Sequence, residues 1–93
     1  MKAKRFASVW DAIEETPGEA ENMKLRAKLM RVIIDTIARE GLSQAQAAKL
    51  LGVTQPRVSD LVRGKTDLFS VDTLVNMLAA AGLRVDLKIA RQR

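Results

Sequence analysis

The sequence predicts a single, mainly α-helical domain, and three observations carry this prediction. Apolar residues make up 47% of the 93 residues but aromatic residues only 3%, so the core must consist of Leu, Ile, Val, Met and Ala, which suits packed helices. The apolar residues recur with helical spacing over much of the chain. Four of the five glycines stand where an expected helix ends. A chain of this length holds one core and at most a tail.

A boundary is expected at residues 15–22, "ETPGEAEN", where Pro17 and Gly18 should break any helix. The sign of the charge changes there as well. Residues 1–22 hold three basic and five acidic residues, whereas residues 23–93 hold 13 basic and 6 acidic ones. We therefore divide the chain into an acidic N-terminal segment with a linker, 1–22, and a basic domain, 23–93. The overall charge of +5 favours a polyanionic partner.

The first two expected helices follow this linker. From Met23 onward, apolar residues recur at helical spacing, which predicts a long amphipathic helix that Gly41 ends. The second helix has Ser43 as its N-cap and Gln46 three residues later, which is the pattern of a capping box. Gly52 ends this second helix.

Two further helices are marked in the same way. Thr54 is expected to cap the third helix, and Pro56 lies in its first turn, where a missing backbone N–H costs little. Gly64 ends it. Ser70 is expected to begin the fourth helix, which continues to Gly82.

After Gly82 the spacing of the apolar residues changes from helical to alternating, which is typical of a half-buried β-strand. Charged residues separate its apolar ones. A single strand leaves its backbone groups unpaired, so it needs either the N-terminal segment or the same strand of a second subunit, and pairing across a two-fold axis is the economical solution. We therefore predict a homodimer whose dimerisation residues are Leu83, Val85, Leu87 and Ile89.

Residues 44–61, "QAQAAKLLGVTQPRVSDL", fit a helix-turn-helix motif position by position. Two helices that cross through a short turn need a small residue where their backbones approach, and Ala48 meets this need. The turn needs a residue that tolerates a positive φ, and Gly52 is four positions later. The inward faces need apolar residues, which are Ala47, Leu51, Val53, Val58 and Leu61.

This stretch, "LSQAQAAKLLGVTQPRVSDLVRGK", resembles the Cro/repressor-type (XRE) helix-turn-helix proteins. Together with "SVWDAIEETP", "NMKLRAKLM" and "FSVDTLVNMLAAAGLRV", it resembles the HigA-like antitoxins of type II toxin-antitoxin systems over nearly the whole chain. The resemblance implies a lambda-repressor-like bundle of four to five helices. It also implies a transcriptional repressor that neutralises a basic HigB-like, RelE-fold ribonuclease toxin and represses its own operon.

Carried over to this sequence, the resemblance implies that the helix from Thr54 to Arg63 enters the major groove of double-stranded DNA at a palindromic operator. The Gln55 amide suits adenine, Arg57 either reads guanine or clamps a phosphate, and Asp60 either accepts from cytosine or joins a local ion pair. Pro56 departs from the polar residue usual in the family. The expected base contacts are Gln55, Pro56, Arg57, Ser59 and Asp60. The expected phosphate contacts are Ser43, Gln44, Thr54, Arg63 and Lys65.

The N-terminal segment "RFASVWDAIEETPG" is too short to hold a helix alone in water. One interpretation is that Phe6 and Trp10 dock on their own domain or on the dimer partner. The other is that this acidic segment orders on a basic partner, the toxin of the resemblance, with Trp10 as an anchor in an apolar groove. The expected partner contacts are Phe6, Val9, Trp10 and Ile13.

The composition also excludes whole classes of function. The chain has no cysteine and no histidine, which removes Cys/His metal sites and every Ser-His or Cys-His catalytic pair, so we expect no enzyme, cofactor, metal or small-molecule substrate. There is no apolar run long enough for a membrane span, and a cytoplasmic protein is expected. A free-standing XRE regulator without a toxin remains the alternative, whereas the motif suits B-form DNA better than A-form RNA.

Overall fold

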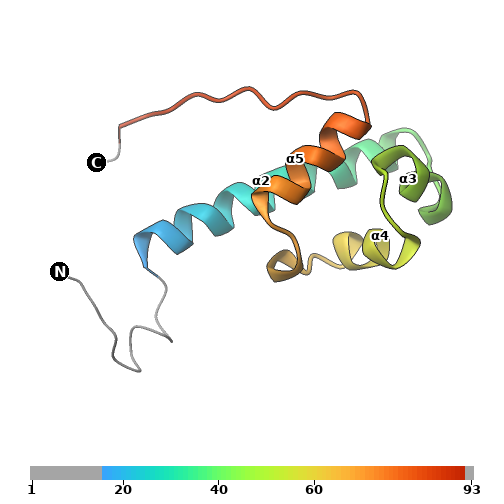
Figure 1. Cartoon of the computed structure of the whole chain (residues 1–93), viewed down its shortest axis with the longest axis horizontal. Coiled ribbons are helices and arrows are strands. Elements are labelled where there is room, and N and C mark those ends of the chain that lie inside the picture. Colours follow the sequence, from blue (N-terminus) through green and yellow to red (C-terminus); the bar gives the residue numbers. More distant parts are fainter. Residues whose placement is uncertain (1–15, 92–93) are drawn as a thin grey trace.

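The computed structural model describes residues 16–91, and this part of the chain is mostly helical, as predicted. Within residues 16–91, four α-helices and one 3-10 helix follow one another (Figure 1). Helix α2 contacts α4, η1 and α5, and α3 contacts α4 and α5. The elements in chain order are α2 (Pro17–Arg39), α3 (Gln44–Leu51), α4 (Gln55–Val62), η1 (Thr66–Leu68) and α5 (Val71–Ala80).

The prediction of a linker at residues 15–22 is wrong for the part that the structure describes, because α2 already begins at Pro17. Thr16 caps the helix: its hydroxyl oxygen accepts from the Glu19 backbone N–H at 3.1 Å, and the Glu19 carboxylate accepts from the Thr16 N–H at 3.3 Å. Pro17 occupies the first turn, where its missing N–H leaves no bond unmade. The boundary expected between residues 22 and 23 therefore runs through a helix.

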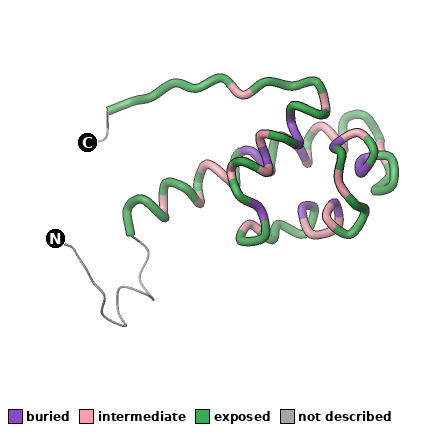
Figure 2. Tube along the Cα trace, in the orientation of Figure 1, coloured by how far each residue is buried: buried purple, intermediate pink, exposed green. Residues whose placement is uncertain are grey.

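The core lies where the four helices meet, and Figure 2 shows its buried positions on the facing sides of the elements. In α2 the first buried residue is Leu29, and Leu25, one turn earlier, is partly buried and packs against the core. Phe69, between η1 and α5, is the largest of the fully buried side chains. The core residues are Leu29, Met30, Ile33, Ala47, Ala48, Leu51, Val58, Leu61, Phe69, Leu74, Met77 and Leu78.

The C-terminal segment is extended but forms no strand within residues 16–91, so the expected strand is absent from the single chain. Its last backbone hydrogen bond joins the Leu83 N–H to the Leu78 carbonyl at 2.9 Å. Val85 packs on the core, whereas Leu87 is 69% and Ile89 87% exposed. The physical reason is that a ladder needs a second extended segment, and the described part of the chain offers none. The segment runs back beside the first half of α2 (Figure 1).

Candidate nucleic-acid interface

Helix α3 and the turn after it have the local geometry that the sequence predicts. The Ser43 hydroxyl accepts from the Gln46 N–H at 3.1 Å, and the Gln46 side-chain oxygen accepts from the Ser43 N–H at 2.9 Å, so the capping box is complete. Gly52 follows α3 with φ +70°. A Cβ added there would meet the Ala80 Cβ at an ordinary 3.8 Å, so the positive φ, not lack of space, requires glycine.

Helix α4 is anchored by one apolar face and exposes the other. Val58 and Leu61 are fully buried and pack with Ala47 of α3 in the core. Gln55 and Pro56 are exposed, and Ser59 and Asp60 are half-buried on the same helix. Burial of one face therefore fixes which polar side chains α4 presents outward.

The N-terminal end of α4 carries side chains that have no partner within the described residues. Thr54 has the backbone conformation of an N-cap, as predicted, but its side chain makes no capping hydrogen bond. Gln55 and Pro56, the first two residues of the helix, are exposed. Pro56 has no backbone N–H and the Arg57 N–H already donates to the Thr54 carbonyl, so the side chains of Thr54 and Gln55 are the groups available to an external donor or acceptor.

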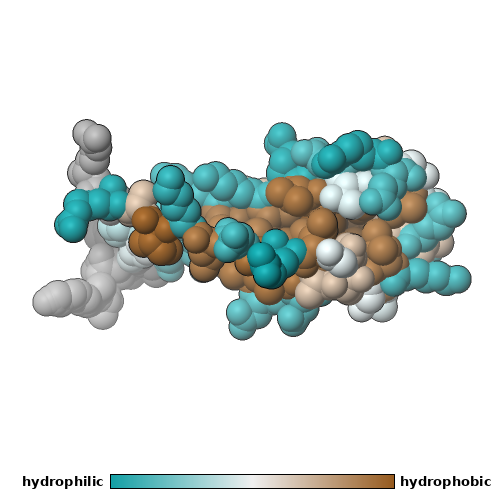
Figure 3. Space-filling model, turned by 90° about the horizontal axis from the view of Figure 1, so that it is seen from above, coloured by the Kyte–Doolittle hydropathy of each residue, from teal (hydrophilic) through white to brown (hydrophobic). Residues whose placement is uncertain are grey.

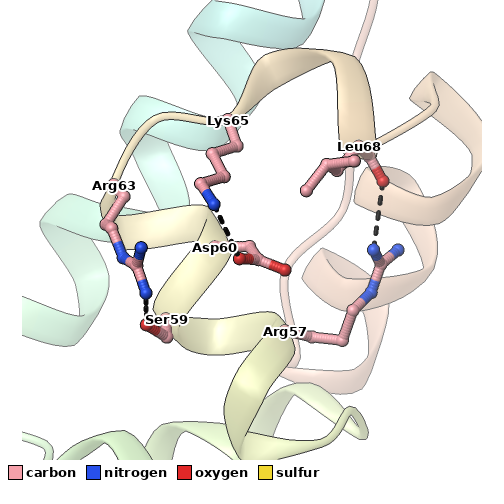
Figure 4. A network of polar contacts seen from close by, with 6 residues as sticks. All are labelled: Arg57, Ser59, Asp60, Arg63, Lys65 and Leu68. Atoms are coloured by element: carbon pink, nitrogen blue, oxygen red, sulfur yellow. Dashed lines mark hydrogen bonds and ion pairs between the residues drawn. The ribbon is translucent and has the colours of Figure 1, made fainter.

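The other polar residues of α4 are already engaged (Figure 4). Asp60 and Lys65 form an ion pair with 3.7 Å between the Lys65 Nζ and a carboxylate oxygen, which confirms the expectation of a local ion pair for Asp60. Arg63 donates to the Ser59 hydroxyl at 3.2 Å. Both cations remain exposed, so each can still meet a phosphate.

Arg57 lies differently from Arg63. Its guanidinium stands over the Phe69 ring, 4.5 Å from the centroid, and its Nη1 donates to the Leu68 carbonyl at 3.1 Å. Figure 4 shows the side chain reaching from α4 to the segment before α5. The residue is half-buried. Any contact of Arg57 with DNA, as the sequence predicts, would compete with these internal contacts.

A second arginine that sequence reasoning did not single out supports the same segment. Arg26 of α2 donates through Nη1 to the Thr66 carbonyl at 2.9 Å, and its Nε donates to the Asn22 side-chain oxygen at 2.6 Å. The carbonyl lies 40 residues further along the chain. No periodicity or spacing in the sequence signals such a contact.

The remaining predicted sites divide into two groups. Ser43 and Gln44 are exposed at the start of α3, beside the helix end that favours an anion. The predicted partner contacts Phe6, Val9, Trp10 and Ile13 lie outside the described residues. Within residues 16–91 no cluster of acidic residues could hold a metal ion. None of the helices in this range combines the length and the apolar character that a bilayer crossing requires.

A short capped helix, a turn at a left-handed glycine and a second helix with an outward polar face define a helix-turn-helix protein, a class of DNA-binding domain. The chain belongs to the helix-turn-helix domain family, whose match covers residues 12–90. This match spans the boundary expected after residue 22. The family match therefore includes the whole of α2 together with the helix-turn-helix motif.

Similar proteins agree with this assignment. An HTH-type transcriptional regulator of Haemophilus influenzae (strain ATCC 51907 / DSM 11121 / KW20 / Rd) is 30% identical over 84 residues, which cover 87% of this chain and 85% of that protein. A solved structure described as an XRE family transcriptional regulator has a TM-score of 0.71 and 37% identity, covering 78% of this chain and 82% of the other. The chain is thus an XRE-type helix-turn-helix protein, as the sequence indicates.

Proposed function

We propose that this protein is a sequence-specific transcriptional regulator that binds a palindromic site in double-stranded DNA as a homodimer. The observation that carries the proposal is the exposed start of α4. There the side chains of Thr54 and Gln55 have no partner within residues 16–91, and the exposed cations of Arg63 and Lys65 follow the same helix. A helix that presents polar groups at its N-terminal end, and is followed by exposed cations after its C-terminal end, suits base contacts in the major groove with phosphate contacts around them.

The test is selection of double-stranded DNA from a random-sequence pool by the full-length protein. We expect enrichment of a two-fold symmetric sequence, with half-sites about 34 Å apart, or a multiple of that distance. Affinity for the enriched duplex should fall as salt rises, because phosphate contacts release counterions. Enrichment of no sequence, or equal affinity for enriched and random DNA, would contradict the proposal.

The homodimer is supported by an apolar surface on the side of the molecule that bears the C-terminal segment (Figure 3). Val32 of α2 is 44% exposed and lines a pocket together with Leu83, which is 41% exposed. Further along, Leu87 and Ile89 face a groove of about 610 Å³ beside the first half of α2. Burial of these side chains against a second copy removes them from water and also offers the extended backbone a partner.

The charges of this segment support one antiparallel register over another. If Asp86 stood opposite Asp86 of the partner subunit, Arg84 would stand opposite Lys88 of the partner subunit, and both pairs repel. If Leu87 stands opposite Leu87 of the partner subunit, Asp86 stands opposite Lys88 of the partner subunit. The two-fold symmetry repeats this attractive pair on the other side of the axis. A register centred on Val85 also matches charges but runs into Gly82, whose φ of +83° ends the extended chain. We therefore infer the Leu87-centred register, which pairs residues 83–91.

Leu87→Cys should form a disulfide-linked dimer under mild oxidation, because directly opposed residues of an antiparallel pair have Cβ atoms about 5 Å apart. The natural chain contains no cysteine, so a single substitution reports on one position. Val85→Cys, two residues away, is the matched control and should remain monomeric on a non-reducing gel. Efficient linkage through Val85→Cys alone would support the Val85-centred register, and a monomer by analytical ultracentrifugation would exclude the dimer.

The acidic N-terminal segment supports a second part of the proposal, neutralisation of a basic HigB/RelE-like ribonuclease toxin and repression of the shared operon. Residues 1–22 carry five acidic and three basic residues, opposite in balance to the rest of the chain. An acidic segment with a Trp anchor can occupy the surface of a basic toxin that would otherwise receive RNA. Without such a toxin, the same DNA-binding module acts as a free-standing regulator.

Deletion of residues 1–15 should abolish toxin binding, because it removes the expected contacts Phe6, Val9, Trp10 and Ile13. It should leave DNA binding within about twofold, because the Thr16 cap of α2 stays in place. The probe is a small basic protein encoded beside this gene, co-purified with the full-length or shortened chain. Trp10→Ala should weaken the complex, whereas Lys2→Ala serves as the control. Full inhibition by the shortened chain would refute this role, and the absence of a neighbouring basic protein would favour the free-standing regulator.

A further inference from the structure

The Arg57 side chain makes two contacts inside the fold, one with the Phe69 ring and one with the Leu68 carbonyl. Its guanidinium carbon lies over the ring of Phe69, 4.5 Å from the centroid, and Phe69 is only 1% exposed and belongs to the core. Nη1 is bonded to the Leu68 carbonyl. A planar cation that is stacked on a buried ring and hydrogen-bonded at one edge has a defined position before any ligand arrives.

The start of α4 lacks the support that the other described α-helices have. The side chains of Thr16, Ser43 and Ser70 each accept a backbone N–H at the start of α2, α3 and α5, whereas the Thr54 side chain makes no such bond at α4. Arg57 is the third residue of α4. Its contact with Leu68 and Phe69 therefore ties the first turn of this helix to the segment before α5.

The segment that receives Arg57 is itself held from the other side. Arg26 of α2 bonds to the Thr66 carbonyl in η1, two residues before Leu68. The contacts from α2 through η1 to α4 thus come from two arginines that donate to backbone carbonyls two residues apart. Together, these two hydrogen bonds restrain the orientation of the first turn of α4 relative to α2.

We propose that Arg57 is a positioning residue, which holds α4 in the orientation that presents Gln55 to the bases and contacts neither base nor phosphate itself. The proposal rests on the proposed role of α4 as the recognition helix. It changes the expectation from the sequence, in which Arg57 either reads guanine or binds a phosphate. Gln55, exposed and without an internal partner in the described chain, then carries the discrimination.

The first test measures binding of Arg57→Met to the duplex that the natural protein enriches from a random pool, over a range of salt concentrations. We expect affinity for this duplex to fall roughly tenfold with an unchanged salt slope, since no phosphate contact is lost. Arg57→Lys should not restore the affinity, because lysine keeps the charge but cannot stack and fork as arginine does. A slope reduced by about one, with rescue by lysine, would overturn the proposal in favour of a phosphate contact.

A second measurement separates positioning from base reading. Selection repeated with Arg57→Met should show weaker preference across the whole half-site, whereas loss of a base contact would relax one base pair alone and overturn the proposal. Phe69→Leu should reproduce the effect of Arg57→Met, and the double variant should bind no worse than either single variant. Thermal unfolding of each variant identifies any that fails to fold. If Phe69→Leu does not fold, the Arg57 variants alone still test the proposal.

The contact can also be followed without reference to affinity. In NMR spectra of the free protein, the ring current of Phe69 should shift the resonances of the Arg57 side-chain protons away from their usual chemical shifts. These chemical shifts should stay changed when the enriched duplex is added. Loss of this change on binding would show that Arg57 leaves the ring for DNA, which overturns the proposal. If the natural protein enriches no sequence, the proposed function fails, while the spectrum of the free protein still tests the internal contact.

Discussion

Replacing Leu61 with alanine will lower the free energy of unfolding by about 2–5 kcal/mol, the range expected when a buried leucine is truncated and its cavity cannot close. Leu61 is fully buried on the inner face of α4, in the same core as Val58 and Phe69. The total free energy of unfolding of a small domain is only about 5–15 kcal/mol. The variant should therefore unfold at much lower urea concentration and lose DNA binding through loss of the fold.

The matched control is Leu68→Ala, the same truncation at a side chain that is 45% exposed seven residues later. This variant should change the free energy of unfolding by less than about 1 kcal/mol, because little apolar surface is lost from the interior. Urea titrations followed by far-UV circular dichroism measure both. Equal destabilisation by the two substitutions would contradict the burial assigned to α4.

Replacing Gln55 with alanine will weaken binding to the enriched DNA by about 1–3 kcal/mol and will leave binding to random DNA nearly unchanged. The reason is that a bidentate amide contact discriminates between bases but neutralises no phosphate. Gln55 lies at the first position of α4 and has no partner within residues 16–91, so its removal leaves the fold intact. Fluorescence anisotropy with the two duplexes, at fixed salt, measures the difference.

Gln44→Ala is the matched control, since it makes the same substitution at the first position of α3. Gln44 is expected near a phosphate, so its loss should weaken binding to enriched and random DNA by the same factor. The ratio of the two affinities should therefore change only in Gln55→Ala. A constant ratio in both variants would remove Gln55 from base recognition and leave shape as the source of specificity.

Most helix boundaries could be predicted because their causes are local. The capping box of Ser43 and Gln46 and the left-handed turn at Gly52 involve residues at most a few positions apart, and the structure confirms both. The apolar residues on the inward faces of α3 and α4 could be predicted from the positions that a helix-turn-helix motif requires, and Ala47, Leu51, Val58 and Leu61 are buried there. These elements bring together the whole motif.

Two predictions failed because the same local signals have more than one physical outcome. Pro17 was expected to break a helix, yet in the first turn it starts one, since Thr16 and Glu19 complete the cap around it. The alternation from Leu83 to Ile89 indicates an extended backbone, which the structure has, but no ladder. Alternation describes the faces of a segment and says nothing of whether a partner strand is present.

The sequence by itself therefore determined the class of the protein, the cap of α3 and the turn at Gly52, since each of these depends on spacing within a few turns of chain. Only the tertiary structure decided what the charged side chains around α4 do. Arg57 meets a carbonyl 11 residues away and Arg26 one 40 residues away. Such contacts depend on how the helices pack, because a flexible cation bonds to whichever carbonyl or ring the finished fold brings within its reach.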